Sequence, residues 1–222
     1  MDWSALALSL KLGALTVLVL LPIGIVVGRG LAFHRFKGRG FAEAALSLPL
    51  VLPPTVLGYY LLMTFGAASP IGRGWQEVVG HTLAFSFEGL LLASIVANLP
   101  FAIQPMQRGF EAIPPDVREA AACSGLSPLQ VLWKIDLPLA WPGIVTGLVL
   151  AFAHTLGEFG VVLMVGGNIP GETRTIAVAI YDRVHAFDTY GAGIMSALLL
   201  LLSLAALGVT YILSSKIGRR YA

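Results

Sequence analysis

Five long apolar stretches constrain the fold of this chain more than any other feature of its sequence. They cover about residues 5–28, 43–66, 84–106, 141–166 and 191–215. A helix needs about 20 mostly apolar residues to cross the hydrocarbon core of a bilayer, and each stretch is long enough. The runs are continuously apolar, which does not fit the alternating strands of a membrane barrel. Because only helices and closed barrels satisfy the backbone in lipid, we predict an all-α polytopic membrane protein with five transmembrane helices.

The composition agrees with this prediction. Of the 222 residues, 57% are hydrophobic and 12% are charged, and the mean hydropathy is +0.83. Soluble domains carry about 25% charged residues. A sixth helix would need residues 75–85 or 175–187, and we expect both segments to be too short and too polar. The single cysteine, Cys123, excludes an intrachain disulfide and any multi-cysteine metal site.

The basic residues are distributed unevenly between the two sides of the membrane. Three segments hold ten of them: Arg29, Arg35, Lys37 and Arg39; Arg108, Arg118 and Lys134; Lys216, Arg219 and Arg220. The opposite loops hold only Arg73, Arg174 and Arg183. The positive-inside rule therefore places the 29–42 loop, the 107–140 loop and the C-terminus in the cytoplasm, with the N-terminus outside. Such basic loops touch anionic lipid heads, and we expect no nucleic-acid binding.

The 107–140 loop contains the signals of two short helices. Pro114-Pro115 disfavours helix before it, Asp116 is a good N-cap, and Glu119 stands three residues later, close to a capping box. Three alanines at 120–122 continue this helix, and Gly125 suits its left-handed end.

A second helix is predicted to follow the glycine. Ser127 is its N-cap, Pro128 fits the first helical position, and Gln130 completes a capping box. We predict that it ends near Leu137-Pro138 and that its apolar anchors are Leu129, Leu132 and Trp133. Two capped helices around a bend favour a rigid docking element, whereas Trp133 also suits amphipathic helices lying on the lipid surface. Physical reasoning alone leaves both interpretations open.

The same loop resembles the EAA motif of ABC importer permeases. Glu119-Ala120-Ala121, three residues, Gly125, nine residues, Ile135, one residue and Leu137-Pro138 match the motif at each signature position. The resemblance implies that residues 1–222 form one type I ABC importer transmembrane domain. It also implies that 107–140 is a coupling loop that sits in a groove of an ATP-hydrolysing subunit. The expected coupling residues are Glu119, Ala120, Ala121, Gly125 and Leu129.

The resemblance also implies the partners. These are a second copy of this chain, two cytoplasmic ATP-binding subunits, an extracytoplasmic binding protein and the lipid of the bacterial inner membrane. The sequence lacks the P-loop pattern G-x-x-x-x-G-K-[ST], so we expect that this chain is not an enzyme and that ATP and Mg²⁺ are used by the partner. We expect no cofactor and no metal in this chain.

Two further stretches narrow the family. Residues 48–62, "LPLVLPPTVLGYYLL", and 154–182, beginning "HTLGEFGVVLMVGG", are similar to molybdate-type permeases. Sulfate permeases are also similar at "GEFG" and "GGNI", whereas "LPPTVLGYY" and "NIPGETRT" are closer to the molybdate type. The resemblance implies import of molybdate by alternating access, with sulfate, thiosulfate or tungstate as the alternative.

Residues of the transport path are predicted from physical arguments. Pro53 and Pro54 interrupt helical hydrogen bonds, which suits either a path that opens and closes or a static kink. Thr55 beside them would repair the backbone or face the path.

His154 and Glu158 are four residues apart and share a helix face. Because an ionised carboxylate repels an oxyanion, we favour a structural or gating role for Glu158 over substrate binding. Two ligands are too few for a metal site. Small residues at Gly157 and Gly160 would let helices cross closely.

The outer loop after residue 166 offers Asn168 and Arg174, which would guide an anion or contact a partner. Two functions of other classes stay open at this stage. One is a lipid-directed membrane enzyme with His154 and Glu158 as acid and base. The other is an anchor for a cytoplasmic complex that does not transport.

Overall fold

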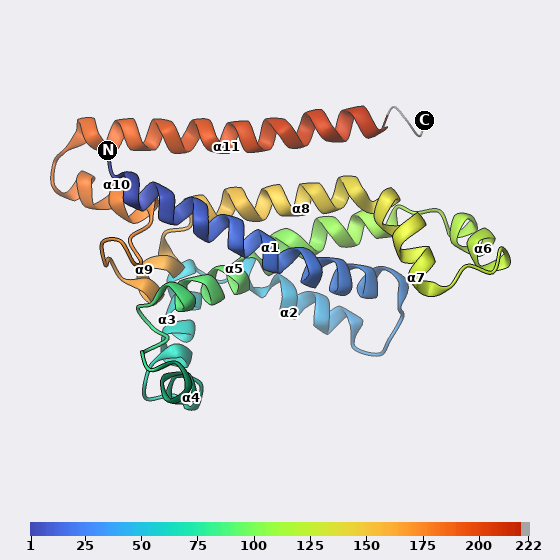
Figure 1. Ribbon diagram of the computed structural model, residues 1–222, viewed down its shortest axis with the longest axis horizontal. Helices are drawn as coiled ribbons and strands as arrows, with labels where there is room; N and C mark the ends of the chain where they lie inside the picture. The colour runs from blue at the N-terminus through green and yellow to red at the C-terminus, as the bar shows by residue number, and fades with distance from the viewer. Residues whose placement is uncertain (219–222) are drawn as a thin grey trace.

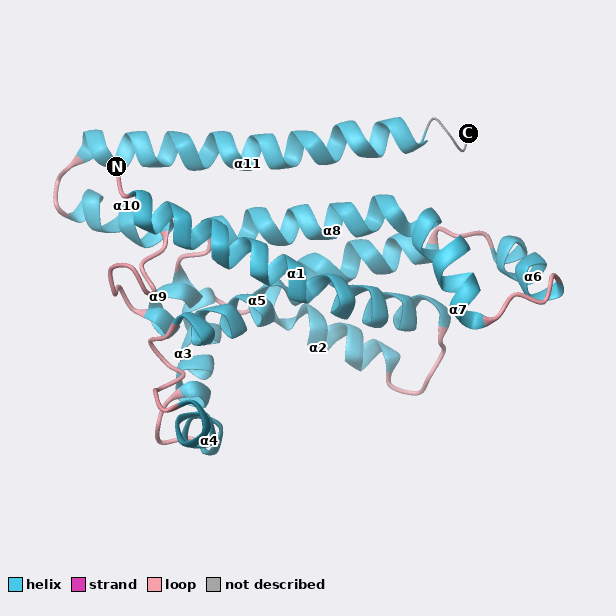
Figure 2. Cartoon of the chain, in the orientation of Figure 1, coloured by secondary structure: helices cyan, strands magenta, loops and turns pink. Residues whose placement is uncertain are grey.

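The computed structural model describes residues 1–218, and every regular element in that range is a helix (Figures 1 and 2). The all-α prediction is therefore confirmed. Arg219 and Arg220 of the basic tail lie outside the described residues.

Four long helices run alongside one another: α1 (Trp3–Phe33), α5 (Phe87–Glu111), α8 (Leu137–Gly157) and α11 (Thr189–Gly218) (Figure 1). Helices α1, α5 and α11 are each long and apolar enough to cross a membrane, and so is α8 together with the turns that precede it from Pro128. The centre of the bundle is an apolar cluster from α1, α5 and α8, whose fully buried members include Leu20, Ala102, Met106, Phe110, Ala140 and Ala151. Helices α1, α5 and α8 therefore form the rigid body of the molecule.

Helices α5 and α8 cross closely because glycines face each other. A Cβ atom on Gly143 would lie 2.5 Å from the carbonyl oxygen of Pro105 and 2.8 Å from the Cα atom of Gly109. A Cβ atom on Gly147 would lie 2.6 Å from the carbonyl oxygen of Ala102. Lipid tails are as apolar as leucine, so helices in a membrane associate through this kind of close packing.

The predicted interruption at Pro53 and Pro54 is confirmed, because the stretch 43–66 is two helices rather than one. Helix α2 (Arg39–Val51) and helix α3 (Pro54–Phe65) meet at an angle of 108°. Leu52 and Pro53 between them have extended backbone angles. Each precedes a proline, and proline disfavours the helical conformation in the residue before it. If the bent pair is one span, the number of candidate spans rises from four to the predicted five.

The stretch 141–166 is also broken. Helix α8 ends at Gly157, Glu158 is extended, and the short helix α9 (Gly160–Gly166) follows. The two segments considered for a sixth span contain the end of α4 (Pro70–Val79) and α10 (Ile176–His185). Both of these helices have only 10 residues.

The ends of the bundle agree with the charge-based orientation. The loop after α1, helix α6 (Pro115–Cys123), helix α7 (Pro128–Val131) and the C-terminal end of α11 lie toward one end (Figure 1). The N-terminus, α9 and α10 lie toward the other end (Figure 1). The segments that we assign to the cytoplasm are thus grouped in space.

The α5–α8 crossing yields a first prediction. Gly143→Ala places a Cβ atom against backbone that cannot rotate away, and overpacking of this kind costs about 1–3 kcal/mol. We expect a lower temperature of unfolding in detergent, measured by circular dichroism. Gly193→Ala in α11 is the matched control, because nothing described lies within 4 Å of its added methyl group. Equal stability of the Gly143 variant and the wild type would contradict the close crossing.

Candidate functional site

Helix α6 forms the first half of a bent element at the cytoplasmic end. Gly125, just beyond its end, has a φ of +73°, and the Leu126 N–H donates to the Ala121 carbonyl at 3.2 Å. The predicted left-handed glycine end is confirmed. The predicted N-cap is wrong, since α6 begins at Pro115 and Asp116 lies within the first turn. Proline is well suited to the first helical position, because its missing N–H would have no helical partner there.

The second half contains the predicted capping box. The Gln130 N–H donates to the Ser127 hydroxyl at 3.3 Å, and the Ser127 N–H donates to Gln130 Oε1 at 2.8 Å. This helix does not end near Leu137, however. It passes through a wide π-helical turn, η1 (Leu132–Asp136), directly into α8. Proline clashes with the carbonyl four residues before it, and the wide turn lies where Pro138 would cause this clash.

We call residues 115–136 the elbow. Of the five predicted coupling residues, Glu119, Ala120, Gly125 and Leu129 are exposed, with Leu129 64% exposed. Ala121 is only 4% exposed and faces the chain itself, so its place is inside the elbow. Trp133, four residues after Leu129 in the same continuous helix, is 65% exposed. The elbow therefore presents a small-residue and apolar surface at the end of a helix that runs into the bundle.

The predicted path residues are only partly brought together. A cavity of about 140 Å³ is lined by Pro54, His154 and Glu158 among others. Pro53 and Thr55 are exposed and do not line it. A Cβ atom on Gly160 would lie 2.6 Å from Pro54 Cβ, which confirms a close approach of α9 to α3. The same expectation for Gly157 is wrong, because nothing described lies within 4 Å of a Cβ there.

Glu158 is a buried carboxylate at the break between α8 and α9. Its Oε1 atom accepts the Val161 N–H at 2.9 Å, and its Oε2 atom lies 3.5 Å from His154 Nε2. The side chain thus caps α9 where the backbone ladder is interrupted. This contact supports a structural role. In the described part of the chain, no three His, Cys, Asp or Glu side chains gather in a way that would hold a metal.

A chain of buried polar side chains continues from His154 across the bundle, and sequence reasoning missed it. Asn98 Oδ1 lies 3.0 Å from His154 Nδ1, and Asn98 Nδ2 donates to Thr155 Oγ1 at 3.0 Å. Thr16 Oγ1 of α1 donates to the Ser94 hydroxyl, also at 3.0 Å. In a membrane such bonds between helices contribute about 0.6 kcal/mol each. The spacing of Ser94 and Asn98 on one face of an apolar helix is the signal that would have found them.

The two outer-loop residues meet in a network of polar contacts. Arg174 Nε donates to Asn168 Oδ1 at 2.6 Å, and Asn168 Nδ2 donates to Asp182 Oδ2 at 2.7 Å. The Arg174 guanidinium also lies 3.8 Å from Asp2 at the start of α1. The Ala5 N–H and this guanidinium both lower the pKa of the Asp2 carboxyl. Both predicted residues are thus engaged within the chain, where they join the outer loop to the N-terminus.

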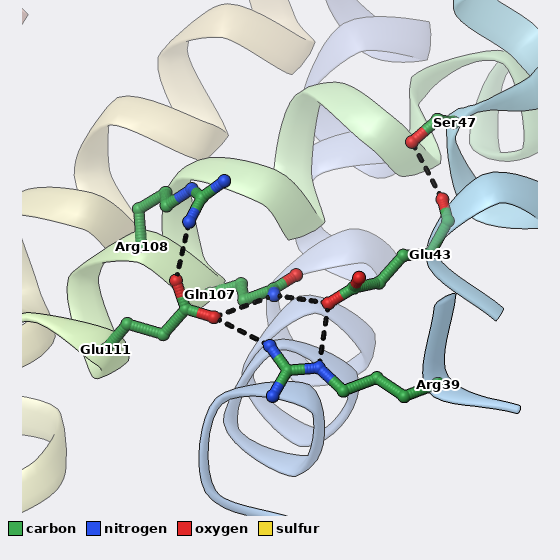
Figure 3. Close-up of polar contacts among 6 residues, drawn as sticks. All are labelled: Arg39, Glu43, Ser47, Gln107, Arg108 and Glu111. Atoms are coloured by element: carbon green, nitrogen blue, oxygen red, sulfur yellow. Dashed lines mark hydrogen bonds and ion pairs between the residues drawn. The ribbon is translucent and has the colours of Figure 1, made fainter. Parts of the chain in front are cut away.

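A second network that sequence reasoning missed joins α2 to the end of α5 (Figure 3). Gln107 Nε2 donates to Glu43 and to Glu111, each at 2.9 Å. Arg39 donates to the same two carboxylates, also at 2.9 Å each. Within the described chain no side chain of α2 is fully buried, and these polar contacts attach its first turns to α5. The cavity beside them has a volume of about 310 Å³.

The comparisons with known proteins agree with this geometry. Residues 21–219 match the family described as "Binding-protein-dependent transport system inner membrane component". The chain belongs to this family. It is a multi-pass permease of the inner membrane, in agreement with the EAA-like elbow. A solved bacterial ABC transporter involved in alginate import has the same fold, with a TM-score of 0.72 at 17% identity over 98% of this chain and 78% of that one.

Individual relatives carry more specific names. A molybdenum transport system permease protein, ModB, of Azotobacter vinelandii is 45% identical over 95% of this chain and 93% of its own length. The ModB protein of Escherichia coli is 38% identical over 98% and 94%. A probable sulfate transport system permease protein of Chlorella vulgaris is 33% identical over 92% and 76%.

The cap on α9 yields a second prediction. Glu158→Gln retains an oxygen that accepts the Val161 N–H, whereas Glu158→Ala removes it, and loss of a helix cap costs about 1 kcal/mol. We expect the glutamine variant to unfold in detergent close to the wild type and the alanine variant at a lower temperature. Equal losses in both variants would instead show that the negative charge is what the site requires.

Proposed function

We propose that this chain is the membrane-spanning permease subunit of an ATP-driven molybdate importer. The elbow carries this proposal, because it presents the EAA-like surface outward and is continuous with α8. The molybdenum permeases named above are similar over nearly their whole length, which supports molybdate as the cargo. Sulfate is the second candidate, since a sulfate-named relative is also similar at lower identity.

The elbow is the proposed seat of a separate ATP-hydrolysing subunit. Exposed Glu119, Ala120 and Leu129 would contact the groove of that subunit, while Gly125 sets the bend. Because α7, η1 and α8 form one continuous helix from Pro128 to Gly157, a displacement at the elbow is transmitted into the bundle. ATP and Mg²⁺ are then bound by the partner, and this chain supplies the mechanical link.

A second copy of the chain is the proposed partner across the transport path. The bent pair α2–α3 exposes large apolar side chains, including Phe41, Leu48, Val51, Tyr59, Tyr60 and Met63. An apolar surface of this kind beside interrupted helices suits a path between two copies, which Pro53, Pro54 and Thr55 would border. The coupling loop occurs once per chain, and two copies would serve two ATP-hydrolysing subunits.

The outer end is the proposed contact for a soluble binding protein. An open cavity of about 770 Å³ there is lined by Lys11, His81, Glu88 and Glu172 among others. The loop held by Asn168 and Arg174 borders this end of the bundle and would present a fixed surface to the binding protein. The family description, a binding-protein-dependent system, supports this partner.

Reconstitution tests the function directly. The chain is combined in proteoliposomes with its ATP-hydrolysing subunit and a molybdate-binding protein, and uptake of labelled molybdate is measured with and without ATP. We expect ATP-dependent uptake that excess tungstate or sulfate reduces less than unlabelled molybdate does. Uptake of sulfate in preference to molybdate would establish the alternative cargo, and uptake of neither would refute the proposal.

The glycine bend yields a separate prediction. Gly125→Val forces a branched side chain into the left-handed region, which costs about 1–2 kcal/mol and distorts the elbow. We expect at least a tenfold loss of ATP-dependent uptake, on the order of the loss that misplacement of a functional group causes. The chain remains inserted in the membrane. Gly38→Val is the matched control, because Gly38 also has a positive φ and open space but lies outside the elbow.

A further inference from the structure

A fully buried carboxylate lies at the base of the elbow. Asp136 is 0% exposed and belongs to η1, where the elbow joins α8. Arg29 Nε of α1 donates to Asp136 Oδ2 at 2.7 Å. Arg118 Nε of α6 lies 3.3 Å from Asp136 Oδ1 and forms an ion pair whose geometry is not that of a hydrogen bond. One carboxylate therefore joins η1 to the neighbouring helix α6 and to α1, whose Arg29 is 107 positions away in the sequence.

Arg118 also links α6 to α1. Its guanidinium carbon lies 3.5 Å from the centroid of the Phe33 ring of α1, which is a close cation–π contact. Among the residues of α6 whose burial is described, only Ala121 is fully buried. Arg118 thus contacts both α1 and η1, which makes it a link between α6 and two other segments.

Buried ion pairs are weak stabilisers, because the cost of desolvation offsets most of their attraction. An ion pair requires its two charged groups to be close and suitably oriented, however. Removing one partner leaves a buried charge that is uncompensated. Two arginines around one carboxylate fix the angle between α6, α1 and η1.

We propose that Asp136 is a positioning residue for energy coupling and that it holds the elbow at a fixed angle to α1 through Arg29 and Arg118. This inference rests on the proposed function, in which the elbow receives force from an ATP-hydrolysing subunit. Motion of α6 is then transmitted to α1 as well as to α8. We call these contacts of Asp136 the joint. Without the joint, the partner subunit binds and hydrolyses ATP, but α6 moves relative to α1 and does not transmit the motion.

The test compares three substitutions in the assembled transporter. Asp136→Asn removes the carboxylate charge, Arg118→Leu keeps an apolar group over Phe33, and Arg118→Lys keeps the positive charge. The quantity measured is molybdate taken up per ATP hydrolysed. We expect about a tenfold lower ratio for Asp136→Asn and Arg118→Leu, with the ATPase subunit still copurifying, and a ratio nearer to wild type for Arg118→Lys. Arg35→Leu, at an exposed arginine of the neighbouring loop, is the matched control.

A second measurement does not depend on transport. Hydrogen exchange of the purified chain in detergent reports the stability of α6 directly, and loss of the joint should raise exchange of its amides by about tenfold while the core of α1 is unchanged. Unchanged exchange in Arg118→Leu, or a wild-type ratio of uptake to hydrolysis, would overturn the proposal. If Asp136→Asn fails to assemble, Arg118→Leu decides, because Arg118 is partly exposed on α6. If the wild type takes up no molybdate, the proposed cargo is refuted, and the hydrogen-exchange result alone tests the role of Asp136.

Discussion

The structure depends on one constraint, which is that backbone polar groups in a lipid environment need partners within the protein. An unbroken helix meets this requirement by itself, so each interruption needs a specific replacement. At the α8–α9 break the replacement is the Glu158 carboxylate, which accepts the Val161 N–H. At the α2–α3 break two prolines remove donors instead, since Pro53 and Pro54 have no N–H to satisfy. The two interruptions are adjacent in space, where Gly160 packs against Pro54.

The arrangement of broken and continuous helices divides the chain into parts with different mechanical roles. Helices α1, α5 and α8 pack around a common apolar cluster. The interrupted segments lie beside it, and the second half of the elbow, from Pro128 onward, continues into α8 as one helix. In the proposed function, a displacement at the docking surface would be carried along this continuous helix into the packed bundle.

Much of this was predictable from local sequence signals. Hydropathy located the long helices, and the capping box at Ser127 and the left-handed Gly125 followed from short-range rules. The two prolines at 53 and 54 predicted an interruption there, although not its angle. The break at Glu158 was not predicted, because hydropathy is averaged over a window and does not change when an apolar helix bends. The joint at Asp136 and the Asn98 network were missed because their partners lie in other helices, and sequence spacing alone does not show which faces meet.

The exposure of helix α2 bears on how stable a subunit is before it pairs with others. The helix buries no side chain of its own chain among the described residues, and the contacts in Figure 3 attach mainly its first turns. If two copies pair as proposed above, the exposed apolar side chains of α2, such as Phe41, Leu48 and Val51, would gain protein neighbours from the second copy in place of lipid. In that case, by mass action, the local stability of α2 would rise with the density of copies in the membrane. An unpaired copy would then present α2 as its segment most accessible to membrane proteases.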